Sequence, residues 1–203
     1  MNYLLKGGRV VDPCQKLDSE PLDILVENGR IARLERDISK TNNAARRTKS
    51  GDFTIFDLSG MVIVPGLVDI HTHLREPGFE YKETIRTGCE AALAGGFTSL
   101  ACMPNTQPVN DNRAVTEFIR RRAQEFDLAK VYPVAAITAN LKGERLAEFG
   151  DLKDAGAVAF SDDGKPVMQG GVMRRALEYA ASLHMPVISH CEDLNLAGKS
   201  ESG

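Results

Sequence analysis

Three of the four histidines of this sequence and one pair of aspartates lie where apolar segments end. His71 and His73 stand two residues apart in VDIHTHLREPG, Asp162 and Asp163 follow AVAF in FSDDG, and His190 closes PVISH. Residues two apart on a β-strand point to the same face, so the imidazoles of His71 and His73 can share one ion. Imidazoles joined by a carboxylate suit zinc or a similar divalent ion. Taken alone, the pair is a weak signal for metal, and two ordinary surface or structural histidines are the favoured interpretation.

Two further polar residues follow the same segments and are candidates for substrate binding. Arg75 comes two residues after His73 and offers a fork of N–H donors that matches a carboxylate. Asn105, in MPNTQP, carries an amide that can orient a polar substrate. A surface salt bridge for Arg75 and a loop-stabilising role for Asn105 fit their positions equally well.

A metal site beside a carboxylate-binding group indicates hydrolysis of an amide-like bond. Water is a poor nucleophile at neutral pH, whereas water bound to zinc has its pKa lowered to roughly 7, and the ion also polarises a carbonyl group. If two metals were present, they would share an anionic bridge, and Asp163 is the acid best placed to provide it.

The elements that must position these residues form a repeating pattern after residue 65. Strand-like runs start at residues 67, 97, 131, 157 and 186, at intervals of 26 to 34 residues, and amphipathic helical stretches separate them. Each interval is close to the length of one βα unit, so the pattern predicts a parallel sheet. An open doubly wound sheet and a closed barrel both remain compatible with it. In a barrel, the active site lies at the carboxyl ends of the strands, where the histidines and aspartates fall.

Residues 1–65 show a different pattern and predict a separate small β unit. Short strands alternate with turns, and Asn28-Gly29 is typical of a type I′ hairpin. The segment 39–52 is polar and lacks apolar periodicity, so we expect a solvated loop with surface charges. The sequence therefore predicts two domains, 1–65 and 66–203.

Composition excludes several classes of protein. The chain has 203 residues, 42% of them hydrophobic, and a net charge of −3. It carries no basic cluster for nucleic acid, no apolar run long enough to span a membrane and no apolar secretory signal, so we expect a cytoplasmic protein. Its four cysteines form no CxxC pair, which predicts reduced and mostly buried thiols. Metal ligation by Cys191, beside His190, is the less favoured alternative.

Four strings together resemble the class I dihydroorotases of the amidohydrolase superfamily. They are VDIHTHLREPG, AGGFTSLACMPNTQPVND, FSDDGKPVM and VISHCED, in this order. The resemblance implies a distorted TIM (β/α)8 barrel beside a small β-sandwich. It also implies an enzyme with two zinc ions that interconverts N-carbamoyl-L-aspartate and dihydroorotate in pyrimidine biosynthesis.

The resemblance also implies roles for single residues. His71 and His73 would bind the first zinc, Asp163 would bridge both ions, and His190 would bind the second. The preference for Asp163 over Asp162 follows the family's spacing to the histidine, here 27 residues. His73, together with the arginine and asparagine named above, would hold the substrate carboxylate.

Neighbouring enzymes of the superfamily are the alternatives within this class. Many amidohydrolases, hydantoinases among them, have a carboxylated lysine where this chain has SDDG, and allantoinases and hydantoinases usually lack the arginine of HLR. Both differences favour dihydroorotase.

The barrel implied by the resemblance is larger than the segment present. Residues 66–203 supply five predicted strands, whereas a complete barrel has eight strands and about 250 residues. The resemblance places a further zinc-binding histidine and the aspartate that serves as general acid/base beyond Gly203. We therefore expect the N-terminal half of an active enzyme, with an inactive scaffold relative as the alternative. Expected partners are the small-molecule substrate and either a second copy or aspartate carbamoyltransferase.

Overall fold

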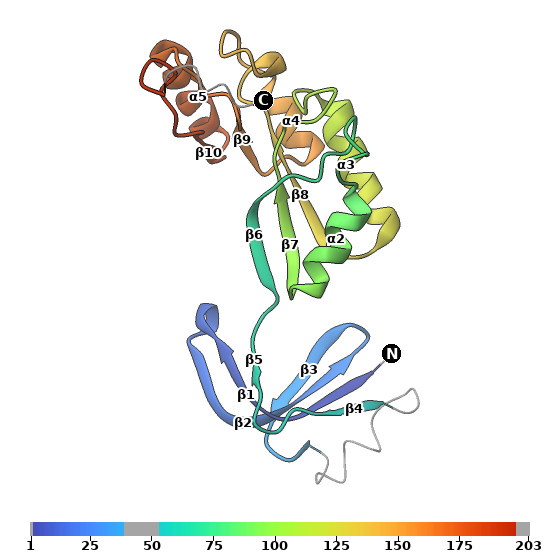
Figure 1. Cartoon of the computed structure of the whole chain (residues 1–203). Coiled ribbons are helices and arrows are strands. Elements are labelled where there is room, and N and C mark those ends of the chain that lie inside the picture. The colour runs from blue at the N-terminus through green and yellow to red at the C-terminus, as the bar shows by residue number, and fades with distance from the viewer. Residues whose placement is uncertain (1, 39–52, 198–203) are drawn as a thin grey trace. The chain divides into compact units, whose positions relative to one another are not determined.

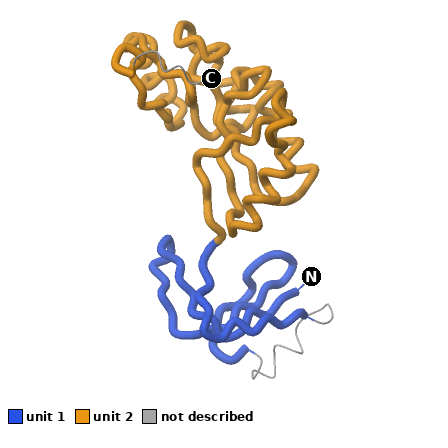
Figure 2. The backbone as a smooth tube through the Cα atoms, in the orientation of Figure 1, with its two compact units in different colours: residues 1–65 blue, residues 66–203 orange. Residues whose placement is uncertain are grey.

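The computed structural model describes residues 2–38 and 53–197. The chain divides into two compact units, residues 1–65 and residues 66–203 (Figure 2). The expected solvated loop at 39–52 lies outside the described residues.

The first unit is a mixed five-stranded sheet (Figure 1). Its strands are β1 (Tyr3–Asp12), β2 (Leu17–Glu27), β3 (Arg30–Glu35), β4 (Thr54–Asp57) and β5 (Val62–Ile63), with a short 3-10 turn, η1 (Pro13–Gln15), after β1. The strand order is β3-β2-β1-β4, and β5 also pairs with β1. Strand β2 runs antiparallel to β1 and β3, whereas β4 and β5 run parallel to β1.

The hairpin between β2 and β3 has the turn that its sequence predicts. Asn28 and Gly29 have φ angles of 51° and 73°, and the flanking Glu27 and Arg30 are paired across the strands. Positive φ at both central residues defines a type I′ turn, whose twist matches that of the strands.

The second unit is a parallel five-stranded sheet with helices packed on it. The strands are β6 (Leu67–Thr72), β7 (Phe97–Cys102), β8 (Lys130–Ala135), β9 (Ala159–Ser161) and β10 (Val187–Ile188). The helices are α2 (Ile85–Ala94), α3 (Arg113–Phe126), α4 (Phe149–Ala155) and α5 (Gly170–Ser182), and a 3-10 turn η3 (Ala139–Leu141) follows β8. The spatial order β10-β9-β8-β7-β6 repeats the order in the chain. A doubly wound sheet would reverse its order at a switch point, so this order confirms the barrel-type arrangement.

Apolar side chains between the helices and the strands form the core of the second unit. One cluster joins α2 and α3 to β7 and includes Ile85, Leu100 and Ile119, each nearly inaccessible. A second cluster lies around Phe149 and Phe160, whose rings stack with centroids 3.8 Å apart. These contacts fix the positions of the strands from the side that the helices cover.

Strand β6 is an edge strand of the described sheet and exposes apolar side chains. Val68 and Ile70 are 61% and 71% exposed. This exposure agrees with the expectation that a five-stranded segment of a barrel leaves apolar surface unpaired.

The cysteines only partly follow the sequence analysis. All four are free thiols, but only Cys89 and Cys102 are buried, whereas Cys14 and Cys191 are exposed. The expectation of mostly buried thiols is therefore wrong for two of them, because Cys14 lies in the exposed turn η1 and Cys191 in the segment after β10. Burial raises the pKa of Cys102 to about 12 and also raises the pKa of Cys89.

The rate of alkylation should distinguish the exposed pair of cysteines from the buried pair. Because the thiolate is the reactive form, iodoacetamide at neutral pH should modify Cys14 and Cys191 in the native protein and should modify Cys89 and Cys102 only after denaturation. Peptide mass spectrometry with and without guanidinium measures this. Native labelling of Cys102 as fast as that of Cys14 would contradict the packing described for β7.

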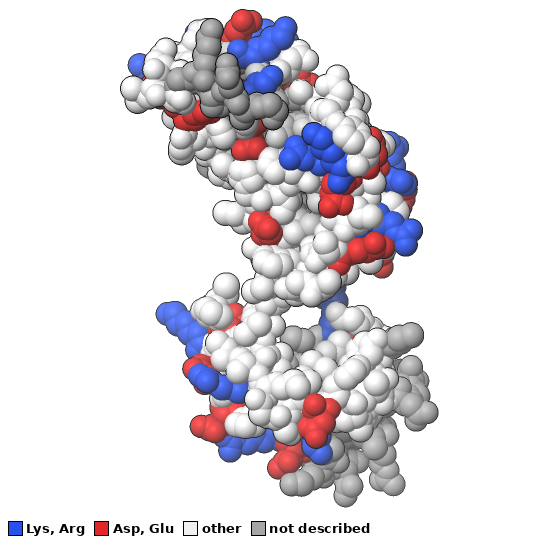
Figure 3. All heavy atoms as spheres, viewed as in Figure 1, with Lys and Arg blue, Asp and Glu red and all other residues white. Residues whose placement is uncertain are grey.

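Charge and membrane propensity complete the description. Figure 3 shows Lys and Arg interspersed with Asp and Glu on the visible face, without one region of a single sign. Among the described residues, no helix is both long and apolar enough to cross a membrane.

Candidate metal centre

Two histidines and an aspartate converge at the carboxyl ends of the strands. His71 lies near the end of β6, His73 directly follows it, and Asp163 follows β9. Nε2 of His71 lies 3.2 Å from Oδ1 of Asp163, and Nε2 of His73 lies 3.5 Å from Oδ2. One ligand atom from each residue can be chosen so that all lie within 4.8 Å of one another. Two imidazole nitrogens and a carboxylate are a donor set that suits a divalent ion, so this group could hold a metal.

The backbone around Thr72 fixes the direction of the two imidazoles. The Thr72 hydroxyl donates to the carbonyl of Ala101 on β7 at 2.9 Å, and its own carbonyl accepts from Met103 N–H at 2.8 Å. The N–H of His71 donates to the Asp69 carboxylate at 3.0 Å. The residue between the histidines is thus tied to β7, and both rings are left to face Asp163.

Asp162 and Asp163 have different surroundings. Asp162 is 2% exposed, and its carboxylate accepts the N–H groups of Ile137 and Thr138 at 2.8 and 2.9 Å as well as the Thr138 hydroxyl. Burial raises the pKa of Asp162, and these hydrogen bonds oppose the rise. Asp163 lies in the turn that follows β9, and its carboxylate is directed elsewhere. Asp162 therefore ties the end of β9 to the segment after β8, while the carboxylate of Asp163 faces the histidines.

His190 lies near the same carboxylate but farther from it. Its Nδ1 is 3.7 Å from Oδ1 of Asp163, and its Nε2 is 3.3 Å from Oε2 of Glu192. The group of three whose ligand atoms lie within 4.8 Å does not include His190. Its role as a ligand of a second ion stays a prediction. The contact of His190 with Glu192 was not predicted from the sequence. The acid two residues after the histidine in HCED could have indicated it.

Asn105 contacts two members of the group. Its Oδ1 lies 2.9 Å from Nδ1 of His73, and its Nδ2 donates to Oδ2 of Asp163 at 3.5 Å. If Nδ1 of His73 carries the proton for the first contact, Nε2 is left free to bind a metal. The sequence analysis considered Asn105 only for the loop or the substrate, and it missed this orienting contact because sequence separation hides it.

Arg75 is half-buried, and its guanidinium makes no ion pair or hydrogen bond with any of the described residues. The alternative of a surface salt bridge is therefore not observed in this part of the chain. An unpaired, half-buried guanidinium two residues from His73 is available to an anionic ligand.

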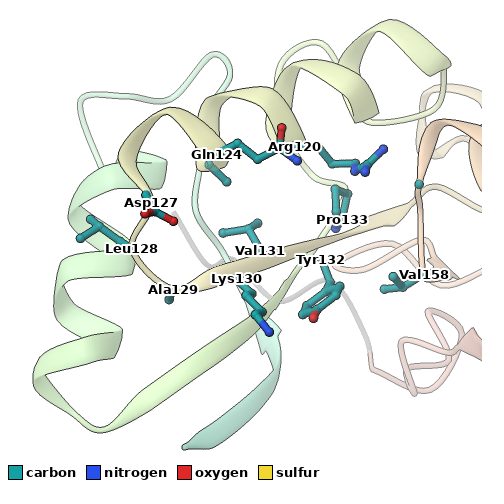
Figure 4. Close-up of a pocket in the computed structure, with 12 residues that line it drawn as sticks. Arg120, Gln124, Asp127, Leu128, Ala129, Lys130, Val131, Tyr132, Pro133 and Val158 are labelled. Atoms are coloured by element: carbon teal, nitrogen blue, oxygen red, sulfur yellow. The ribbon is translucent and has the colours of Figure 1, made fainter. Parts of the chain in front are cut away.

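A pocket of about 370 Å³ lies elsewhere, at the amino end of β8 (Figure 4). Among the residues that the structure describes, β8 pairs with β9 only at Val134 and Ala135, so the first half of β8 has no β9 partner. The pocket lies beside this half of β8, and Arg120 and Gln124 of α3 are among the residues that line it. Since parallel strands end at the opposite edge, this pocket does not contribute to the metal-binding group.

Comparison with known proteins identifies the family. A family model described as dihydro-orotase-like matches residues 60–202. The chain belongs to this dihydroorotase-like family of amidohydrolases. It is 62% identical over 197 residues to the dihydroorotase of Syntrophus aciditrophicus and 55% identical over 199 residues to that of Geobacter sulfurreducens. These matches cover 97% and 98% of this chain but 44% of each relative, so the chain spans about half the length of the curated relatives it matches.

Solved structures agree on the fold. The L-hydantoinase from Arthrobacter aurescens matches with a TM-score of 0.76 at 21% identity, covering 94% of this chain and 41% of that one. A crystal structure of a dihydroorotase matches with a TM-score of 0.59 at 13% identity, covering 92% of this chain and 50% of that one. At these identities the likeness shows the amidohydrolase fold alone.

Removing one ligand should remove metal. In the protein expressed from its complete coding sequence, Asp163→Asn and His71→Ala should each lower zinc affinity at least 10-fold, because a structural ligand contact is lost. Zinc bound after dialysis against a weak chelator, measured by atomic absorption, tests this. The control is Glu178→Gln on the exposed face of α5, which should retain wild-type zinc. Unchanged zinc in Asp163→Asn would show that the cluster is not the metal site.

Proposed function

We propose that this protein is a zinc-dependent dihydroorotase, which interconverts N-carbamoyl-L-aspartate and (S)-dihydroorotate plus water in pyrimidine biosynthesis in the cytoplasm. The observation that carries the proposal is the convergence of His71, His73 and Asp163. Arg75 follows His73 by two residues, and its guanidinium has no partner among the described residues. The identity to proteins named dihydroorotase supports the choice of substrate.

The proposed ligand roles centre on the carboxylate of Asp163. Oδ1 faces His71 and His190, whereas Oδ2 faces His73. All three histidines thus lie near one carboxylate. Following the resemblance to the dihydroorotases, His71 and His73 would bind the first zinc, His190 the second, and Asp163 would bridge the two ions. Zinc bound at such a site acidifies a water molecule and polarises a carbonyl oxygen, which is what the opening of a cyclic amide requires.

The chain's own residues would bind and orient the substrate. Arg75 would hold the substrate carboxylate through two parallel N–H donors, and the amide of Asn105 would hold the same group from the opposite loop. His73 would lie next to this carboxylate. Because Asn105 also contacts His73, the position of the substrate would be coupled to the position of a ligand.

The general acid/base is left to a residue outside this chain. Asp162 is an unsuitable candidate, because its carboxylate is buried and already accepts three hydrogen bonds. We propose an aspartate beyond Gly203 for this role.

Two alternatives make different predictions. A hydantoinase or allantoinase would act on a ring without the carboxylate, so Arg75 would be dispensable. A scaffold relative, acting through a second copy or an aspartate carbamoyltransferase, would bind little metal and would not turn over dihydroorotate. The aspartate pair at the end of β9 and the availability of Arg75 favour the dihydroorotase.

Arg75→Met tests the function and the role of the arginine together. Loss of two charge-assisted hydrogen bonds should lower kcat/KM for dihydroorotate about 100-fold, mostly through KM, while zinc content stays at the wild-type value. Dihydroorotate turnover and metal analysis of the same preparation measure both quantities, and Arg75→Lys should show an intermediate KM. Loss of zinc would mean that Arg75 supports the metal site instead. Failure of the zinc-loaded wild-type protein to turn over dihydroorotate would refute the function.

A further inference from the structure

We propose that Glu76 and Arg122 form a positioning pair that fixes the direction of Arg75 from outside the site. This inference rests on the proposed function, because it concerns the carboxylate-binding arginine. Neither residue reaches the metal-binding group, and neither has a role in the chemistry described above.

The backbone of Arg75 needs external support. Its φ angle is 62°, in the left-handed region that residues with a Cβ seldom occupy. Such conformations persist where the surroundings determine them, and they cluster at functional sites. The turn itself gives part of this support, because Phe79 N–H donates to the Arg75 carbonyl at 3.0 Å and Glu76 N–H donates to the Leu74 carbonyl at 2.7 Å. Side-chain contacts of the neighbouring residues add to it.

Glu76 supplies one anchor for the loop. Its carboxylate is 6% exposed, and carboxylates are almost never buried without partners. Oε2 accepts the N–H of Ile85, the first residue of α2, at 2.9 Å, and Oε1 accepts from Nε of Arg122 on α3 at 3.0 Å. The side chain of Glu76 therefore joins the loop of Arg75 to the first turn of α2 and to the guanidinium of Arg122 on α3.

Arg122 is itself held in place by its own helix. Its Nη1 donates to Glu125 at 2.9 Å, and its guanidinium lies 4.7 Å from the centroid of the Phe126 ring. About two-fifths of its side chain is exposed, so it can be replaced without leaving a cavity in the core. It presents Nε to Glu76 in one orientation.

A second anchor lies on the other side of Arg75's loop. Gln107 N–H donates to the carbonyl of Pro77 at 2.9 Å. Gly78 lies so close to Gln107 that a Cβ on this glycine would be 2.1 Å from the Gln107 carbonyl oxygen. This contact joins the loop of Arg75 to the loop of Asn105. Glu76 is thus fixed to the helices and Pro77 to the loop of Asn105. These two anchors would hold Arg75 and Asn105, the residues proposed to bind the substrate carboxylate, at a constant separation.

The pair predicts a defect in substrate binding rather than in metal binding. In the protein expressed from its complete coding sequence, Arg122→Gln should raise KM for dihydroorotate about 10-fold, since a small displacement of a binding group is costly. Values of kcat and zinc content should change less than twofold. Arg122→Lys should recover part of the loss by restoring the charge. The matched control is Arg121→Gln, the exposed neighbour on α3, which should behave as wild type.

A double-mutant cycle distinguishes a role of Arg122 in positioning Arg75 from a role in stabilising the fold alone. If Arg122 acts through Arg75, adding Arg122→Gln to Arg75→Met should change KM no further, because the group being positioned is already gone. A purely structural role would lower the melting temperature and would add its effect on KM to that of Arg75→Met. Additive effects, or an Arg122→Gln enzyme with unchanged KM, would overturn the inference.

The outcomes also separate this inference from the function on which it rests. A wild-type protein that turns over dihydroorotate, with a strong Arg75→Met defect but a silent Arg122→Gln, would refute the positioning pair alone. A wild-type protein without that activity would refute both.

Discussion

In a parallel sheet all strands run in the same direction, so the residues that follow β6, β7, β9 and β10 meet at one edge. This constraint brings His71 into contact with Asp163, although more than 90 residues separate them in the chain. The strand order repeats the order of the sequence, so each βα unit adds one strand and one set of end residues. The metal-binding group exists because neighbouring units in the sequence are also neighbours in space.

A buried carboxylate outside the metal-binding group helps to maintain this arrangement. Burying an ionised group is costly unless hydrogen bonds replace its water, and Asp162 obtains three of them from Ile137 and Thr138. The contacts join the ends of β8 and β9, where only two residue pairs connect these strands. The two adjacent aspartates therefore have different roles. Asp162 fixes the backbone at the ends of β8 and β9, and Asp163 faces the imidazoles.

Much of this organisation could be predicted from the sequence because it depends on periodicity. The alternation of strand and helix patterns located all five strands of the second unit, and the spacing of His71 and His73 placed both on one side of β6. The exposed thiols of Cys14 and Cys191, the contact of Asn105 with His73 and the anchoring of Glu76 were not predicted. These depend on how turns and loops fold back on one another, and no local pattern encodes that.

The account as a whole depends on the position of the metal. Anomalous diffraction at the zinc edge, from crystals of the zinc-loaded protein expressed from its complete coding sequence, tests it most directly. We expect a zinc peak about 2.0–2.2 Å from Nε2 of His71, Nε2 of His73 and a carboxylate oxygen of Asp163. A fully occupied zinc bound elsewhere, or dihydroorotate turnover with no metal at these three residues, would contradict it.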